Sequence, residues 1–340
     1  MERTVVVICL SHTSHTSISL IPSMAVDCDP PFSDATINFA YVPDDTRRAY
    51  QCINVDPTTG VREKNLAHSP YAVRIASVQR DDTDITPDTA GFAFQRAPTK
   101  CTDFTSDEYI ERDYYPETME LLKSLTGASK VLILITVRHL ATKIRNCASD
   151  LCPAIRRRRP GIVDDGPTKR QLVPQAHVDQ TNKSAVDRVY RHLPQEADAL
   201  LKKRVQLLNL WRPISHAAFD WPLALCDYRS VDPEKDVFPV ALIYPDRESE
   251  TMGVRYNTNQ RWMYHYGMTP EDIVLFKWYV DFPGIHPYGA RTDVFVFSYD
   301  SVQDGSVALY APHSAFLDDH APPGACLRES IEIRALVFYG

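Results

Sequence analysis

Val205-Gln-Leu-Leu-Asn-Leu-Trp211 is the first of a series of strand-like runs that decides the fold class. Similar runs follow at 240–244, 252–256, 273–279, 307–310 and 331–339. All are rich in residues that favour extended structure, and no helical periodicity separates them. Many short strands without intervening helices are typical of a jelly-roll barrel or sandwich. The sequence therefore predicts a mainly β fold in this half of the chain.

The N-terminal half predicts further strands and flanking helices. Segment 130–137 is a nearly continuous apolar run that predicts a buried strand, and residues 35–100 read as short strands and turns. Apolar residues recur at helical spacing over 106–125, where Ser106 can cap a helix and Pro116 stands near a break. A second helix is expected over 183–203, divided at Pro194.

Composition and charge exclude several classes of protein. The 340 residues are 44% hydrophobic and 24% charged, which is enough for a substantial core. The net charge of −7 disfavours a nucleic-acid-binding protein, because phosphate contacts need a basic surface. The basic run 156–159 is expected to be a solvated loop, since Asp164 and Asp165 follow closely. No stretch approaches the roughly 20 apolar residues of a membrane span, so we expect no membrane partner.

Cysteine spacing and the N-terminus indicate the compartment. The eight cysteines form no C-x-x-C pair, so we expect reduced, mostly buried thiols rather than disulfides or a zinc site. The apolar run 5–10 is too short for the core of a signal peptide. We therefore expect a cytoplasmic protein with a disordered extension over 1–34 and a single domain over 35–340.

One histidine motif has the spacing of a metal site. Non-haem Fe(II) oxygenases hold iron with two histidines and one carboxylate on a single face. In a strand, a spacing of two places the side chains of H-x-D on the same side of the sheet. His177-Val178-Asp179 is the only H-x-D among the eleven histidines. Taken alone, the motif is weak, and a solvated pair of polar residues is the simpler interpretation.

The rest of such a site is expected further along the chain. Only His313, among six later histidines (His192, His216, His265, His286, His313 and His320), closely follows a strand-like run. Arg328 and Ser330 share one face of the last predicted strand, so guanidinium and hydroxyl can hold one carboxylate together. Arg334 lies on that face too and is the reserve candidate. A loop histidine and a surface arginine remain the simpler alternatives for His313 and Arg328.

Other catalytic classes lack their motifs. The chain has no H-E-x-x-H of a zinc hydrolase, no G-x-S-x-G elbow and no G-x-G-x-x-G dinucleotide fingerprint. Trp211 and Arg212 lie on a predicted core strand, and we expect them to contact a substrate, Arg212 facing an acidic or carbonyl group. A structural ion pair is an equal alternative for Arg212.

Short motifs occur in a characteristic order along the chain. They are Arg157-Arg-Arg-Pro-Gly161, His177-Val-Asp-Gln-Thr181, Asn209-Leu-Trp-Arg-Pro213, Trp221-Pro-Leu-Ala-Leu-Cys-Asp227, Ile243-Tyr-Pro-Asp-Arg247, Gln260-Arg-Trp262, Leu275-Phe-Lys277, Asp300-Ser301, Pro312-His-Ser-Ala-Phe316 and Arg328-Glu-Ser-Ile-Glu-Ile-Arg-Ala335. In this order they resemble the AsaB-type hydroxylase/desaturase family, which includes fungal gibberellin desaturase and some members labelled as cephamycin-type "methyltransferases". The resemblance runs from about Ile37 to the C-terminus.

The resemblance implies a fold and a chemistry. The fold is a double-stranded β-helix with a cupin-like core over about 165–340. The activity is hydroxylation or desaturation of a small-molecule substrate in fungal secondary metabolism, with Fe(II), 2-oxoglutarate and dioxygen. It implies that His177, Asp179 and His313 hold the iron. It further implies that Arg328, helped by Ser330, binds 2-oxoglutarate.

Two segments, 139–156 and 280–299, interrupt the family pattern, and their excision would restore it. We interpret them as translated introns of a gene model or as surface insertions. Sequencing the transcript tests this, because a mature message that contains both segments would exclude introns.

Two other functions stay open at this point. A catalytically inactive β-helix protein could bind a pathway intermediate or a partner enzyme. A cupin-like isomerase or cyclase could use the same iron without 2-oxoglutarate, which would leave Arg328 dispensable. Metal-dependent turnover of the co-substrate separates these functions.

Overall fold

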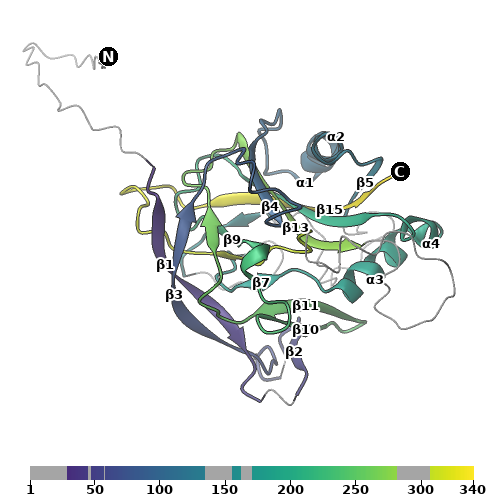
Figure 1. The fold of residues 1–340 in the computed structure, drawn as a ribbon, viewed down its shortest axis with the longest axis horizontal. Coiled ribbons are helices and arrows are strands. Elements are labelled where there is room, and N and C mark those ends of the chain that lie inside the picture. Colours follow the sequence, from purple (N-terminus) through teal and green to yellow (C-terminus); the bar gives the residue numbers. More distant parts are fainter. Residues whose placement is uncertain (1–28, 45–46, 57, 135–154, 162–170, 282–306) are drawn as a thin grey trace, which may run out of the picture.

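The computed structural model describes residues 29–44, 47–56, 58–134, 155–161, 171–281 and 307–340 (Figure 1). The strands are β1 Phe32–Tyr41, β2 Ala49–Cys52, β3 Ala67–Ser77, β4 Phe92–Arg96, β5 Lys130–Ile133, β6 Arg156–Arg157, β7 His177–Val178, β8 Val205–Pro213, β9 Leu223–Cys226, β10 Val237–Ile243, β11 Glu248–Val254, β12 Trp262–Tyr264, β13 Asp272–Asp281, β14 His313–Ala315 and β15 Glu329–Phe338. The helices are α1 Asp107–Tyr109, the π-helical turn η1 Ile110–Tyr114, α2 Tyr115–Thr126, α3 Asn182–His192, α4 Ala197–Leu200 and the 3-10 turn η2 Tyr228–Ser230.

The strands form two sheets. One sheet has nine strands in the order β1-β3-β12-β9-β14-β7-β11-β10-β2. The other has six strands: five follow the order β4-β13-β8-β15-β5, and the sixth, β6, pairs with β15. Neighbours in each sheet are mostly distant in sequence, and nearly all pairs are antiparallel. This winding of two antiparallel sheets confirms the predicted mainly β, jelly-roll fold.

The inner faces of the two sheets pack against each other. Ile37, Val178 and Trp262 of the nine-stranded sheet share one buried cluster with Leu207 and Leu336 of the six-stranded sheet. Because side chains alternate along a strand, the opposite face of the six-stranded sheet carries a second apolar set. That set, with Leu208, Leu210, Leu275 and Val337, is covered by Leu122 of α2 (Figure 1).

The predicted helices form, with the expected cap at Ser106 and the expected break at Pro194. Ser106 caps α1, and its hydroxyl accepts a hydrogen bond from the backbone N of Tyr109 at 3.2 Å. The π-helical turn lies directly before Pro116, which occupies the first turn of α2. Pro194 divides the second helix into α3 and α4, as predicted. Within the described ranges, no helix has the length and apolar character needed to cross a membrane.

Some predictions about the fold were wrong. The run 307–310 is not a strand, and the strand of this region is β14, three residues later. The run 156–159 is not a solvated loop either: β6 pairs with β15, and Arg158 binds Asp220 at 2.7 Å. The structured domain begins at β1, before residue 35. Most of the interrupting segments 139–156 and 280–299 lies outside the described residues, and so does 1–28.

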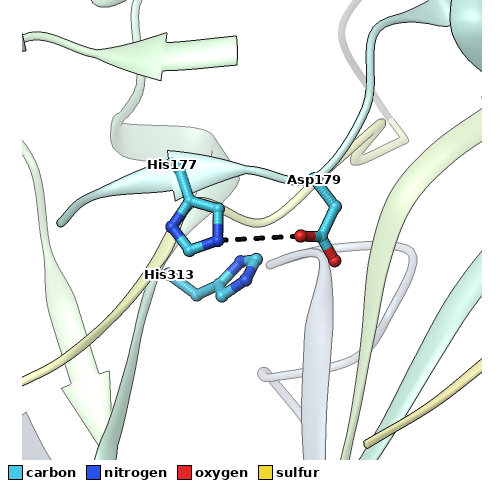
Figure 2. A group of neighbouring side chains, drawn as sticks. All are labelled: His177, Asp179 and His313. Atoms are coloured by element: carbon cyan, nitrogen blue, oxygen red, sulfur yellow. Dashed lines mark ion pairs between the residues drawn. The ribbon is translucent and has the colours of Figure 1, made fainter. Parts of the chain in front are cut away.

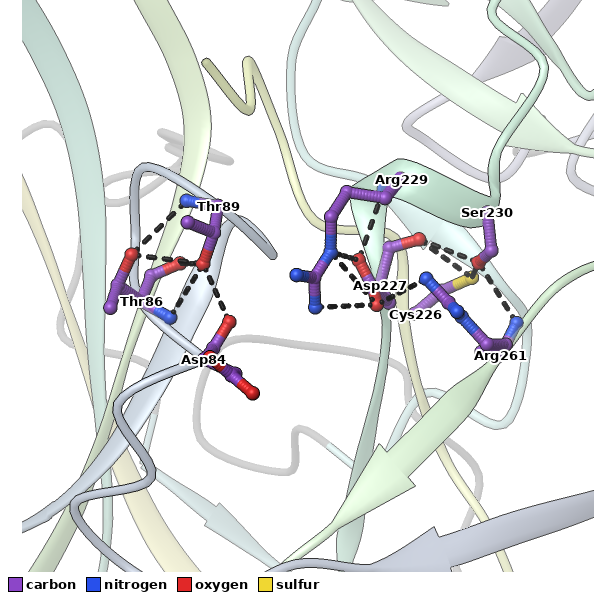
Figure 3. A network of polar contacts seen from close by, with 8 residues as sticks. All are labelled: Asp84, Thr86, Thr89, Cys226, Asp227, Arg229, Ser230 and Arg261. Carbon is purple, nitrogen blue, oxygen red and sulfur yellow. Dashed lines mark hydrogen bonds and ion pairs between the residues drawn. The ribbon is translucent and has the colours of Figure 1, made fainter. Parts of the chain in front are cut away.

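A buried carboxylate fixes the turn after β9. The Asp227 side chain is 0% exposed and accepts hydrogen bonds from Arg229 Nε, Arg261 Nη2 and the backbone N of Arg229 at 2.9, 2.9 and 3.0 Å (Figure 3). We expect Asp227→Ala to lower the free energy of unfolding by about 3 kcal/mol, because the hydrogen bonds that Arg229 and Arg261 donate to one buried carboxylate are lost. Chemical denaturation measures this.

The matched control is Asp246→Ala. Asp246 also pairs with an arginine, Arg247, at 3.0 Å, but its side chain is 70% exposed. Exposed pairs contribute little, so the free energy of unfolding should change by no more than about 0.5 kcal/mol. Equal losses in the two variants would contradict a structural role for the buried network.

Candidate metal centre

The structure brings His177, Asp179 and His313 together (Figure 2). His177 opens β7 and His313 opens β14, and these two residues face each other directly across the antiparallel pair of strands. Their ring centroids are 4.3 Å apart. One nitrogen of each ring and one Asp179 oxygen all lie within 4.8 Å of one another. The arrangement offers two nitrogens and one oxygen from a single face.

Hydrogen bonds fix both imidazoles in the form that binds a metal. His177 Nδ1 lies 2.8 Å from the carbonyl oxygen of Gln175, and His313 Nδ1 lies 3.1 Å from that of Ala311. Because a carbonyl only accepts, each Nδ1 carries a proton, and Nε2 is the nitrogen of each ring that is available to a metal. Burial lowers the pKa of His313 to about 3, so this ring is neutral at physiological pH.

Asp179 is held as an ionised carboxylate by residues of the six-stranded sheet. Asn209 of β8 donates its Nδ2 to Asp179 Oδ2 at 2.6 Å, and Arg334 Nη2 of β15 lies 3.4 Å from the carboxylate. Burial by itself would raise the pKa of Asp179, but Arg334 and the two imidazoles hold it well below its usual value. Two imidazole nitrogens with one carboxylate are the donor set of non-haem Fe(II) sites, so these residues fit that metal.

The inner face of β15 continues the site away from the triad. Ser330, Glu332 and Arg334 alternate along this face, and Arg328 directly precedes the strand. Arg328 and Ser330 are almost completely buried. Arg328 Nη1 donates to the carbonyl oxygen of Trp221. Arg328 Nε and Ser330 Oγ are both buried without a hydrogen-bond partner among the described residues. Such groups cost free energy unless a ligand satisfies them.

Arg328 and Ser330 fit a carboxylate. Burial lowers the pKa of Arg328 to about 9, which shows how unfavourable this charge is in its present surroundings. An anion beside the guanidinium would offset that penalty, and the Ser330 hydroxyl can donate to the same group. The cavity between the triad and Arg328 measures only about 20 Å³. A five-carbon dicarboxylate is larger than this space, so side chains have to shift when one binds.

A second cavity of about 310 Å³ adjoins His177 and Asp179 and is lined by residues of β10, β11 and α3. His177, Asp179 and Arg334 line both cavities. The candidate metal position therefore lies between a small cavity that ends at Arg328 and a larger one of a size typical for small-molecule sites.

The residues predicted to contact a substrate lie on opposite faces of β8. Trp211 lines the small cavity, where Arg328 lies 5.4 Å above its ring. Arg212 points to the other face and lines neither cavity. Its Nη1 donates to the carbonyl oxygen of Pro270 at 2.6 Å, and its Nε donates to the Tyr114 hydroxyl at 3.2 Å. The structure thus gives Arg212 a packing role and does not bring it into the site.

Several site residues were missed from the sequence. Asn209 belongs to a quoted motif and Arg156 to the basic run 156–159, but no spacing rule connects either with H-x-D. Arg188 has no motif at all. Side chains alternate along a strand, so Asn209, two residues before Trp211, points to the same face of β8. This alternation was the one signal in the sequence that could have placed Asn209 in the site.

Asn209 offers a test of how the carboxylate is positioned. We expect Asn209→Ala to weaken Fe(II) binding by roughly 10- to 100-fold, because Asp179 loses the bond that orients it. Anaerobic competition with a metal indicator measures the affinity. Gln206→Ala removes an amide from the same strand whose partner is Tyr339 and should leave the affinity unchanged. Unchanged affinity in both variants would contradict this role.

Comparisons with known proteins agree with the geometry. A family model described as an oxidoreductase/YMDC permease-like domain matches residues 37–282 and 289–338. The hydroxylase/desaturase CTB9 of Cercospora beticola is 32% identical over 281 residues, which cover 78% of this chain and 76% of CTB9. The hydroxylase/desaturase efuI of Hormonema carpetanum is 29% identical over 292 residues, which cover 82% of this chain and 87% of efuI.

A third relative has a solved structure. The Fe(II)/2-oxoglutarate-dependent dioxygenase nvfI of Aspergillus novofumigatus is 27% identical over 295 residues, with 84% of this chain and 90% of nvfI covered. The structure of the iron and alpha-ketoglutarate-dependent endoperoxidase NvfI superposes with a TM-score of 0.67 over 91% of this chain and 99% of NvfI. At 21% identity in that superposition, the likeness shows the shared fold. The family model matches most of the chain, and the alignments with these relatives cover more than three quarters of it. The chain therefore belongs to the AsaB-type hydroxylase/desaturase family.

Proposed function

We propose that the chain is a non-haem iron oxygenase that hydroxylates or desaturates a small molecule of fungal secondary metabolism. His177, Asp179 and His313 would hold Fe(II), and Arg328 with Ser330 would hold the distal carboxylate of 2-oxoglutarate. One observation carries this proposal: Arg328, which lines a small cavity together with the triad, has a buried nitrogen without a hydrogen-bond partner among the described residues, and the hydroxyl of Ser330 lacks such a partner too.

When bound, Fe(II) with 2-oxoglutarate supplies dioxygen-dependent oxidation of a C–H bond, with release of succinate and carbon dioxide. The residues of the chain position the metal ligands and the co-substrate. Asn209 and Arg334 orient Asp179, and the two backbone carbonyls orient the imidazoles. Arg328 fixes the co-substrate at one end through a fork of donors. Buried walls around Trp211 and Leu223 keep bulk water from this side of the metal.

We further propose that the chain from β1 to residue 340 is one domain and that the protein is cytoplasmic. The large buried cluster that joins both sheets supports a single domain. The free thiols of Cys52, Cys101, Cys226 and Cys326 are compatible with a reducing compartment. Relatives named as hydroxylases/desaturases and dioxygenases favour an enzyme over an inactive binding protein.

Anaerobic spectroscopy tests the proposed function. Addition of Fe(II) and 2-oxoglutarate to the purified protein should produce a visible metal-to-ligand charge-transfer band, and succinate in place of 2-oxoglutarate should not. The same measurement on a chain that lacks 139–156 and 280–299 tests the interrupting segments. A band only in the shortened chain would remove those segments from the working protein. No band in either chain would overturn the iron and 2-oxoglutarate assignment.

A further inference from the structure

The segment that leads into β14 lies along one edge of β13. The backbone N of Lys277 donates to the carbonyl oxygen of Gly91 at 2.8 Å, and the carbonyl oxygen of Lys277 accepts from the backbone N of Ala311 at 2.8 Å. The N–H and C=O of one strand residue point to the same edge. Residues 308–311 therefore continue the edge of β13 at the point where β4 begins, at Phe92.

A buried lysine head fixes this segment from the side. Lys277 is 0% exposed, and its Nζ donates to the carbonyl oxygen of Ala308 at 3.2 Å and forms an ion pair with Asp88. The carbonyl oxygen of Asp88 in turn accepts from the backbone N of Ala308 at 2.8 Å. Burial lowers the pKa of Lys277 to about 8, and Asp88 partly offsets that effect. These three residues, which we call the lysine cluster, join β13, the turn before β4 and residue 308.

The same segment rests directly on a glycine. Gly91 has a φ of +91°, and a Cβ at this position would lie 2.7 Å from the carbonyl oxygen of Tyr310. A larger residue would thus be strained in its backbone and would push the segment away. The position of residues 308–311 is fixed both by the lysine cluster and by this close approach.

The fixed segment supplies the hydrogen bond that orients one metal ligand. Ala311 donates its N–H to Lys277, and its carbonyl oxygen lies 3.1 Å from Nδ1 of His313. The His313 ring also packs on Phe276, the residue before Lys277, at a centroid distance of 4.7 Å. A continuous series of bonds therefore connects the lysine cluster with this imidazole. His177 takes its orienting carbonyl from Gln175, so the connection concerns His313 alone of the two rings.

We propose that Lys277 and Asp88 are positioning residues of the metal centre. They act on His313 through the segment 308–311 and set the direction in which its Nε2 points, without contact with metal or substrate. A buried ion pair adds little stability compared with apolar side chains of the same volume, so placement of the segment is the role that this pair fills best. The inference rests on the proposed function, since it concerns the same centre.

Lys277→Met tests the inference. Methionine has a volume close to that of lysine, so the position stays filled, and Asp88 keeps Arg204 as a partner at 2.8 Å. We expect the affinity for Fe(II), measured by anaerobic competition with a metal indicator, to fall at least tenfold. The visible spectrum of Co(II) bound in place of Fe(II) should also change, because one nitrogen donor is misdirected. In the metal-free protein, the backbone amides of 308–313 should exchange hydrogen faster.

The matched control is Arg80→Met. It removes an ion pair at the other end of β13, where Arg80 binds Asp272 at 2.7 Å. Its Fe(II) affinity, Co(II) spectrum and exchange over 308–313 should equal those of the unchanged chain, whatever its stability. Unchanged metal binding in Lys277→Met, or equal losses in both variants, would overturn the inference. If Lys277→Met does not fold, as judged by near-UV circular dichroism, Asp88→Asn decides by the same measurements.

The two proposals can fail separately. A charge-transfer band with 2-oxoglutarate, together with unchanged metal binding in Lys277→Met, would overturn only the positioning role. Fe(II) binding without such a band would overturn the oxygenase, while a tenfold loss of affinity in Lys277→Met would still support the positioning role. No Fe(II) binding by the unchanged chain would overturn both.

Discussion

His177→Ala should abolish both the charge-transfer band and the turnover of 2-oxoglutarate, while the metal-free protein keeps its fold. The triad supplies three donors, and removal of one imidazole leaves a site with too few ligands to hold Fe(II) firmly. His177 lies on a strand of two residues and its side chain is 23% exposed, so little packing is lost. We expect the unfolding free energy of the metal-free protein to change by no more than about 1 kcal/mol. Spectroscopic titration and thermal denaturation measure the two effects.

His177 is a better target than His313 for this test. His313 is 4% exposed and packs against the ring of Phe276 at a centroid distance of 4.7 Å. Truncation of His313 would leave a buried cavity and lower the free energy of unfolding by roughly 2–4 kcal/mol, in addition to its effect on metal binding. His216→Ala is the matched control, because His216 is partly exposed and lines neither cavity. A normal band in His177→Ala, or loss of the fold in the metal-free variant, would contradict the assignment of His177 as a ligand.

The strong features of the fold could be predicted from local sequence. β8, β13 and β15 carry long apolar or β-branched runs, and each was predicted close to its observed bounds. β9 and β12 were not predicted, since strands of four and three residues have too little pattern of their own. Such strands are defined by hydrogen bonds to distant partners, and these are not visible in the local pattern.

The run 156–159 shows the same limit for charged residues. Four consecutive arginines look like a solvated segment, yet Arg157 binds Glu329 at 3.1 Å and Arg158 binds Asp220 at 2.7 Å. These acids lie far along the chain, so the compensation of charge could not be seen locally. The mistake matters for the site, because Asp220 also accepts from the backbone N of Arg328 at 3.0 Å.

The candidate site was predictable where the chemistry needs fixed spacing. H-x-D and R-x-S each place two side chains on one face of a strand. The structure brings His177 and Asp179 together with His313, and Arg328 lines the same small cavity. Which face of β8 points into the site was not predictable, because Trp211 and Arg212 are both buried. Only the position of the facing sheet distinguishes the inner face of this strand from the outer one. Arg188 could not be found, since a helix residue enters the site only through the packing of α3.

Arg328→Gln should raise the concentration of 2-oxoglutarate needed for half-saturation by roughly 30-fold or more. Loss of one member of a buried, hydrogen-bonded charge pair costs about 2–5 kcal/mol. The effect should appear in 2-oxoglutarate binding while Fe(II) binding stays close to normal, because Arg328 is not one of the three metal donors. Anaerobic titration of the charge-transfer band, together with the metal affinity measured separately, distinguishes the two.

Ser330→Ala keeps this prediction testable if Arg328→Gln does not fold. Arg328 is buried and holds the Trp221 carbonyl, whereas the Ser330 hydroxyl lacks a partner among the described residues. Its removal should therefore leave the stability of the unliganded protein unchanged or slightly higher, and weaken 2-oxoglutarate binding by about tenfold, the value of one hydrogen bond to a charged group. An iron isomerase or cyclase that needs no 2-oxoglutarate would give the opposite result. In such an enzyme both variants would turn over substrate normally.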